Sequence, residues 1–212
     1  MNIQLESIMQ TSAMLEMSLT CAVIAIWFIQ QCLQEKMPFA LRVALALIVG
    51  NLFFWPLGLS LELPLAAYVR GATGDLSVVT SLLLWSAFLT KTPGQPIPAG
   101  FKVCITLIAL VFYPLALGYG MFDPYALGYS SMSLLLAVLV FALIWALVGW
   151  IGGVWILALA ILAWSTHWHE SRNLWDYLMD PFLAIWACFS LIFAVFRRRH
   201  QRARSGYLFR AG

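Results

Sequence analysis

The chain has 212 residues, of which 63% are apolar and only 10% are charged, and its formal net charge is +3. A soluble domain carries about 25% charged residues, so this composition excludes a water-soluble fold and predicts a chain embedded in lipid. The length leaves room for several membrane spans with short loops, and we expect one polytopic membrane domain over residues 1–212.

The N-terminal residues Met1–Gln10 contain Glu6 and no basic residue, so we do not expect a cleaved signal peptide. The chain has four cysteines, none in a CxxC pair: Cys21, Cys32, Cys104 and Cys188. Neither a disulfide framework nor a zinc knuckle is therefore expected.

Seven apolar segments follow one another along the chain. A helix needs about 20 apolar residues to cross about 30 Å of hydrocarbon. The predicted spans cover approximately residues 14–33, 39–61, 75–90, 101–118, 132–148, 150–166 and 181–196. We therefore predict an all-α integral membrane protein with about seven transmembrane helices, with a kink near Pro56 in the second and a short third span.

The sixth predicted span depends on dividing one long apolar run, Met132–Thr166. As a single helix this run would be about 52 Å long, well above the thickness of a membrane. The glycines in Gly149–Gly153 favour a tight hairpin between two helices.

Basic residues orient the predicted spans, because cytoplasmic loops are enriched in Lys and Arg. With the N-terminus outside and the C-terminus inside, ten of the twelve Lys and Arg are cytoplasmic, and only Arg70 and Arg172 are outside. Six of the ten lie in a basic tail, residues 197–212, where we expect contact with anionic lipid and not with nucleic acid. The compact chain with its short loops favours the inner, or plasma, membrane of a bacterium over a eukaryotic membrane, which stays the alternative.

The same orientation places eight of the nine carboxylates outside or at the outer boundary: Glu6, Glu16, Glu62, Asp75, Asp123, Glu170, Asp176 and Asp180. Acidic residues contribute little to topology, so the rule that orients the basic residues does not produce this asymmetry. It predicts a polar site on the outer face, built from three outer segments.

The first outer segment, Glu62–Ser77, is too apolar for a solvated loop and too broken for a span. We interpret it as an interfacial or re-entrant segment, which is allowed at membrane depth only when protein or water satisfies its backbone. Arg70 and Asp75 are candidate substrate-binding residues, since a guanidinium suits a phosphate or carboxylate. The alternative is a structural ion pair of Arg70 with Glu62 or Asp75.

The second segment, Tyr119–Tyr129, is turn-rich, and its three tyrosines suit a membrane–water interface. Asp123 either joins a shared substrate-binding site or only starts a turn before Pro124.

The third segment, His167–Asp180, has the highest density of polar groups. We predict catalytic roles in proton transfer for His167, His169, Glu170 and Asp176, paired as His169–Asp176 or His167–Glu170. Asn173 and Arg172 are further candidate substrate-binding residues, with Asn173 also capping a short helix that puts His169, Asn173 and Asp176 on one face. The alternatives are a metal site, although no zinc motif is present, and an interfacial amphipathic helix.

Three function classes remain open. The first is an enzyme, or a subunit of one, that acts on a lipid-linked or phosphorylated envelope substrate. The second is a non-catalytic membrane partner or scaffold of an envelope assembly. The third is a transporter or flippase, which the absence of detectable repeats and of buried charges across the membrane middle disfavours. No motif indicates a cofactor.

Overall fold

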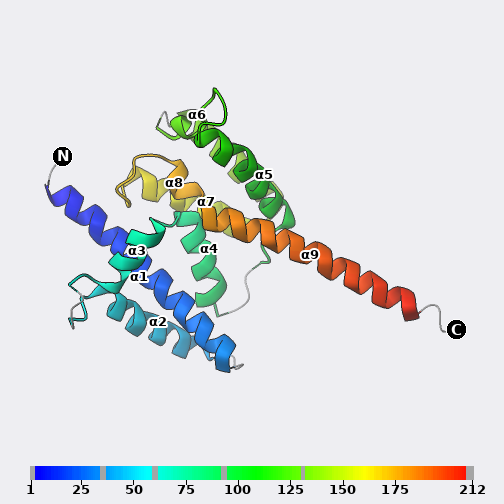
Figure 1. Ribbon diagram of the computed structural model, residues 1–212, viewed down its shortest axis with the longest axis horizontal. Helices are drawn as coiled ribbons and strands as arrows, with labels where there is room; N and C mark the ends of the chain where they lie inside the picture. Colours follow the sequence, from blue (N-terminus) through cyan, green and yellow to red (C-terminus); the bar gives the residue numbers. More distant parts are fainter. Residues whose placement is uncertain (1–2, 34–36, 59–61, 92–94, 130–131, 209–212) are drawn as a thin grey trace. The chain divides into compact units, whose positions relative to one another are not determined.

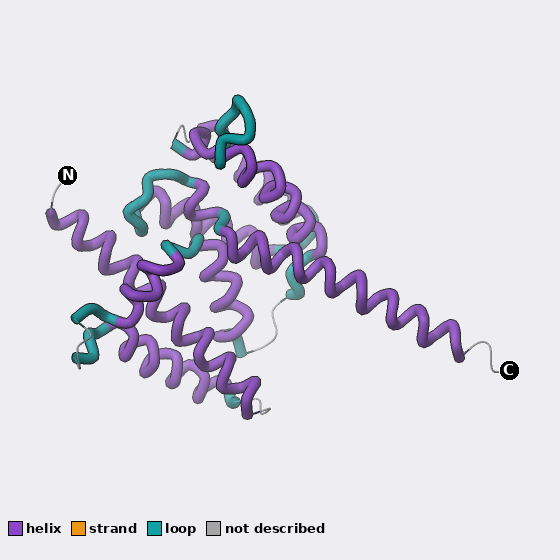
Figure 2. The backbone as a smooth tube through the Cα atoms, viewed as in Figure 1, coloured by secondary structure: helices purple, strands orange, loops and turns teal. Residues whose placement is uncertain are grey.

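The computed structural model describes residues 3–33, 37–58, 62–91, 95–129 and 132–208. Within these ranges the chain consists of helices and loops, with no strand (Figures 1 and 2). The elements are α1 (Ile3–Leu33), α2 (Phe39–Phe54), α3 (Leu65–Thr73), α4 (Val78–Leu89), α5 (Ala99–Ala116), the 3₁₀ turn η1 (Tyr125–Gly128), α6 (Met132–Leu147), α7 (Ile151–Ser165), α8 (Trp175–Leu178) and α9 (Pro181–Leu208).

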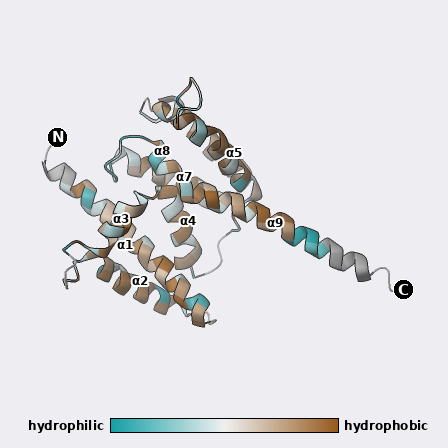
Figure 3. Ribbon diagram, viewed as in Figure 1, coloured by the Kyte–Doolittle hydropathy of each residue, from teal (hydrophilic) through white to brown (hydrophobic). Residues whose placement is uncertain are grey.

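An apolar helix lies in each of the seven segments predicted as spans: α1, α2, α4, α5, α6, α7 and α9. Three of them are long and apolar enough to cross a membrane, over Ser7–Leu33, Ala99–Ala116 and Pro181–Gln201. The other four have 12 to 16 residues, which corresponds to about 18–24 Å. Figure 3 shows the apolar character of these helices and the change to hydrophilic residues along α9.

Proline fixes the start of four helices. Pro38, Pro64 and Pro98 immediately precede α2, α3 and α5, and Pro181 is the first residue of α9. Proline lacks an N–H, which a helix start does not need, and its φ angle already suits a helix. Proline therefore marks the start of each of these helices.

Three helices differ in their bounds from the predicted spans. Helix α1 begins at Ile3, eleven residues before the predicted Met14, because its polar first turns continue the same helix. Helix α2 ends at Phe54, since Trp55 is extended before Pro56, as residues before proline tend to be; the predicted end at residues 59–61 lies outside the described ranges. Helix α9 continues through the basic tail to Leu208.

The predicted break in the long apolar run is confirmed. Helix α6 ends in a Schellman motif, in which the N–H of Trp150 donates to the carbonyl of Trp145 at 2.9 Å and Gly149 has φ +84°. Gly153 then provides room for the Trp150 ring, because a Cβ at this glycine would lie 2.2 Å from a ring carbon. Helices α6 and α7 pack against each other after this turn.

The chain forms two compact units, residues 1–96 with 125–180 and residues 97–124 with 181–212. In the first, Val23 and Ile26 of α1 pack with Ala46 of α2 and Phe88 of α4 in a buried cluster. The Arg42 guanidinium caps α4 by donating to the carbonyls of Phe88 and Thr90 at 2.8 and 3.2 Å. In the second unit, α5 packs against α9. The single domain expected from the sequence stays a prediction.

Candidate functional site at a buried glutamate–histidine pair

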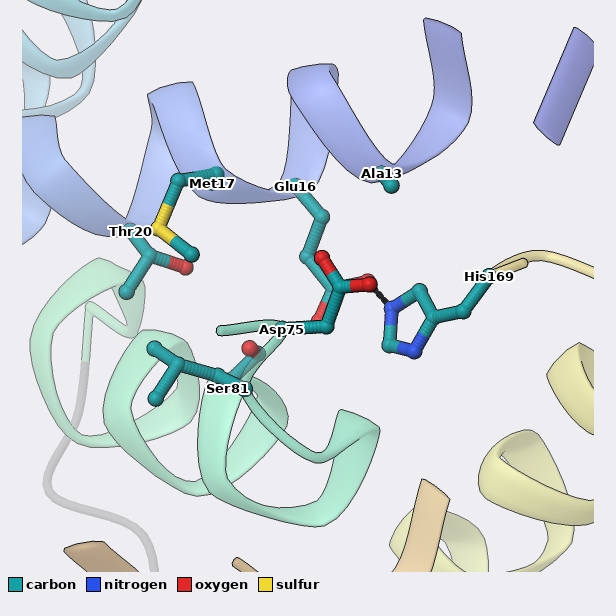
Figure 4. Close-up of a pocket in the computed structure, with 8 residues that line it drawn as sticks. Ala13, Glu16, Met17, Thr20, Asp75, Ser81 and His169 are labelled. Carbon is teal, nitrogen blue, oxygen red and sulfur yellow. Dashed lines mark hydrogen bonds and ion pairs between the residues drawn. The ribbon is translucent and has the colours of Figure 1, made fainter. Parts of the chain in front are cut away.

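A buried acid–base pair lies in the first compact unit. The Nε2 atom of His169 is 2.9 Å from the Oε2 atom of Glu16, and the two side chains are only 2% and 6% exposed. Glu16 projects from α1, whereas His169 lies in the loop between α7 and α8 (Figure 4). Burial of two ionisable groups is costly unless they are paired and hydrogen-bonded, so this contact constrains both segments.

Further bonds hold the His169 loop against α1. The indole Nε1 of Trp168 donates to the same Oε2 atom of Glu16 at 2.9 Å. One turn earlier in α1, the Ser12 hydroxyl donates to the carbonyl of Trp168 at 2.5 Å. Ser12 and Glu16 are four residues apart and thus share one face of the helix, which forms the docking surface for this loop.

Tyr177 of α8 supports the imidazole from its other side. Its ring stacks on that of His169, with centroids 4.9 Å apart. Its hydroxyl accepts the backbone N–H of His169 at 3.1 Å and donates to the carbonyl of Ser171 at 2.9 Å. Burial raises the pKa of Tyr177 to about 12, so the phenol stays protonated over the physiological range.

Three buried polar atoms next to this pair have no hydrogen-bond partner among the described residues: Glu16 Oε1, His169 Nδ1 and Ser81 Oγ. Their residues line one narrow recess between α1, α4 and the α3–α4 connection, with about 170 Å³ of space between atoms and no room for a water molecule (Figure 4). Buried polar groups are normally satisfied. Unused bonding capacity on a histidine, a carboxylate and a hydroxyl therefore marks the recess as the candidate site.

A second charged group adjoins the recess. Asp75 lines it and forms a two-point ion pair with Arg70, whose Nη2 atom donates to Asp75 Oδ2 at 2.9 Å and lies 3.3 Å from Glu170 Oε1. The hydrogen bond to Asp75 raises the pKa of Arg70 above its already high value. Arg70 thus holds Asp75 at the edge of the recess, while Glu16 contacts His169 within it.

A third group of bonds ties the loop to η1. Asp176 accepts the Tyr125 hydroxyl at 2.9 Å and also bonds the Ser171 hydroxyl. Asn173 is fully buried; its Nδ2 donates to the carbonyl of Tyr125 at 2.9 Å and its Oδ1 accepts the N–H of Trp175 at 3.0 Å. Burial and the bond to Asp176 raise the pKa of Tyr125. This network fixes the loop that carries His169.

The structure brings together four of the residues singled out in the sequence: His169, Glu170, Arg70 and Asp75. The predicted pairing of His169 with Asp176 was wrong, because α8 covers only Trp175–Leu178 and the two side chains share no helix face. Glu170 pairs with Arg70 and not with His167.

The remaining candidates lie elsewhere. His167 and Arg172 are exposed, and the Arg172 carbonyl accepts the Trp164 indole at 3.0 Å. Asn173 does not cap α8, whose N-cap is Leu174; its buried amide accepts the N–H of Trp175, the first residue of the helix, and holds the loop together. Asp123 belongs to the other compact unit. The substrate-binding roles assigned to these residues stay predictions.

His167 closes the end of α7. It has φ +55°, and the N–H of Trp168 donates to the carbonyl of Ala163 at 2.9 Å. The same Schellman geometry ends α5 at Gly118 and α6 at Gly149, both with positive φ. His167 thus occupies a position that glycine fills at two other helix ends.

We expect His167→Gly to raise the free energy of unfolding by about 1 kcal/mol, because glycine adopts this backbone conformation without the steric cost paid by other residues. Equilibrium unfolding in detergent micelles measures the change. His167→Ala is the matched control, since it removes the imidazole and keeps the strained conformation. Equal stabilities of the two variants would contradict the explanation.

We expect Tyr177→Phe to lower the free energy of unfolding by about 1–3 kcal/mol near neutral pH, since the His169 N–H loses its buried acceptor. The wild-type pKa is raised from 10.0 to about 12, so the unfolded state releases this proton first and wild-type stability falls from pH 10 through 12. Unfolding at several pH values should show the deficit of the variant narrowing over this window. A constant deficit would show that Tyr177 does not titrate with folding.

Sequence reasoning missed Glu16 as a site residue, although it counted this residue among the outer carboxylates. Glu16 lies at the start of the apolar run that was predicted as the first span, and an ionisable residue within a span is a functional candidate by default. The position of Glu16 within a span was visible in the sequence, whereas its contact with His169 is visible only in the tertiary structure.

The arrangement supports proton transfer. When Glu16 is ionised, Nε2 of His169 donates to it, and Nδ1 remains to accept or release a proton. No group of three His, Cys, Asp or Glu within the described ranges is placed to hold a metal ion. Comparison with known family models, curated proteins and solved structures finds no match to the chain.

Proposed function

We propose that the chain is a multi-pass inner-membrane protein with about seven spans, an outer N-terminus and a cytoplasmic C-terminus, whose Glu16–His169 pair forms an acid–base site at the outer face. Three helices of spanning length, four shorter apolar helices and the positive-inside distribution of Lys and Arg support this placement. The four shorter helices cross the membrane together with the loop residues that flank them, and the bilayer can become thinner around a short hydrophobic segment.

The function that this geometry supports best is catalysis, by the chain itself or as the membrane subunit of an enzyme, on a lipid-linked or phosphorylated envelope substrate. The observation that carries the proposal is the buried imidazole, which is bonded to a carboxylate on one nitrogen and unpartnered on the other. A carboxylate that orients a histidine leaves the second nitrogen for general acid–base work.

Arg70 has a different role in this proposal from the one first expected. Two carboxylates already occupy its guanidinium, so an anionic substrate group binds only by displacing Glu170, the more exposed partner. The recess holds no water as it stands, and substrate entry therefore requires the His169 loop or the α3–α4 connection to move.

Lipid extracts test the proposal. Phosphorus-containing envelope lipids are compared between cells that produce the wild-type chain, His169→Gln, or the control His200→Gln, which makes the same change at an exposed histidine of α9. We expect at least one lipid species to have the same abundance in cells with the wild type and with His200→Gln, and a different abundance in cells with His169→Gln. Identical lipid profiles for His169→Gln and wild type, at equal protein abundance, would overturn the catalytic proposal.

The tight packing of the recess favours a second candidate, a non-catalytic scaffold in an envelope assembly. In that case Glu16 and His169 only hold the loop in place, and His169→Gln lowers stability without changing any lipid. Affinity purification under mild detergent then yields a stoichiometric membrane partner. With His169→Gln, the amount of co-purified partner falls in proportion to the amount of folded protein.

A further inference from the structure

A basic groove lies in the second compact unit, between α5 and the middle of α9. It encloses about 660 Å³, within the range of ligand pockets, and its lining includes Lys102, Trp186, Phe193, Arg197 and Arg198. None of the residues that line it is acidic. Three cations around one opening, without a carboxylate among them, favour an anionic ligand.

The α9 side of the groove changes in character along the helix. Trp186, Ser190, Phe193 and Arg197 follow one another at spacings of three and four residues, so they share one face. The first part of this face is aromatic and the last part is cationic, where α9 turns hydrophilic in Figure 3. An occupant must therefore be apolar at one end and anionic at the other.

Lys102 of α5 lies against the aromatic part of this face, next to Trp186 and Ser190. Its ammonium donates to the Ser190 hydroxyl at 2.8 Å and lies 5.2 Å from the centre of the Trp186 ring, a cation–π contact. Ser190 and Arg197 are seven residues apart, or about 10 Å along the helix, and long cationic side chains can close on an anion placed between them.

We propose that this groove binds an anionic phospholipid, with the phosphate between Lys102 and the Arg197–Arg198 pair and an acyl chain along Trp186 and Phe193. The inference rests on the proposed membrane crossing of α9 and not on the acid–base site. Cations at the end of a span lie at the depth of lipid headgroups. The aromatic wall selects a lipid over a soluble phosphate, which would leave these rings in water.

The test uses the full-length chain purified in detergent and titrated with phosphatidylglycerol, with bound lipid counted by native mass spectrometry. Arg198→Gln and Arg199→Gln make the same charge change at neighbouring exposed positions, but only Arg198 lines the groove. We expect Arg198→Gln and Lys102→Gln each to weaken binding about fivefold, since a cation near a lipid surface contributes about that factor, and Arg199→Gln to bind as the wild type does.

Three results would overturn the proposal. Equal weakening by Arg198→Gln and Arg199→Gln would show diffuse attraction to the tail. Phosphatidylcholine that binds as tightly as phosphatidylglycerol would show that the charge of the headgroup does not contribute to binding. Displacement of the lipid by an equal concentration of inorganic phosphate would assign the groove to a soluble ligand. Arg198→Gln keeps the test valid should Lys102→Gln disturb the packing of α5 on α9, because Arg198 is exposed.

Discussion

Glu16→Ala is expected to lower the free energy of unfolding by about 3–5 kcal/mol, the usual cost of removing one partner from a buried ion pair. The substitution leaves both the His169 imidazole and the Trp168 indole without their acceptor. The matched control is Glu62→Ala, at an exposed carboxylate, where a change within about 0.5 kcal/mol is expected. Equilibrium unfolding in mixed micelles measures both variants.

A double-mutant cycle separates the pair itself from general damage to the loop. Glu16→Gln, His169→Gln and the double variant should be non-additive by about 0.5–3 kcal/mol, as contacting residues are. Additive losses would show that Glu16 and His169 contribute independently, and the site described here would then lack its central contact.

Gly128→Ala is the second change with a large expected effect. A Cβ at Gly128 would lie 1.6 Å from the Oδ1 atom of Asn173. Asn173 is fully buried and bonded to the Tyr125 carbonyl and the Trp175 N–H. Its side chain therefore cannot move away from the added Cβ without losing these hydrogen bonds. We expect a loss of about 2–4 kcal/mol, since overpacking and unsatisfied buried groups each cost about 1–3 kcal/mol.

Gly71→Ala provides the matched control, because no atom beyond the chain neighbours and the backbone of its own helix lies within 4 Å of the Cβ position at Gly71, and alanine is favoured over glycine within a helix. This variant should be neutral or slightly stabilising. The double variant Gly128→Ala/Asn173→Ala should cost less than the sum of its parts, since shortening Asn173 removes the clash. A double variant with the full sum of the two losses would rule out this contact as the cause.

Most of the helices could be predicted because their determinants are local. Apolar runs defined seven helical segments, the glycines at 149–153 defined the α6–α7 turn, and the short α3 lies in the segment predicted as interfacial. The helix bounds differ from the predicted spans where short stretches of sequence decide the helix end. Pro56 ends α2 where a kink was expected, and the polar residues before Met14 extend α1.

The candidate site was only partly predictable, because its contacts join segments that are distant in the chain. The sequence singled out His169 and the Arg70–Asp75 pair, yet it assigned His169 to Asp176, seven residues away. The actual partner, Glu16, is 153 residues away, and no local spacing encodes such a contact. The left-handed conformation of His167 was equally hidden, since its helix end has no glycine to reveal it.

Cysteine labelling in intact cells tests the sidedness on which the proposed outer site depends. Single cysteines at the exposed positions His167 and His200 are introduced into a chain whose four native cysteines are replaced, and a membrane-impermeant maleimide is applied. We predict that residue 167 is labelled in intact cells and that residue 200 is labelled only after the membrane is opened. Labelling of both residues from the same side would contradict it.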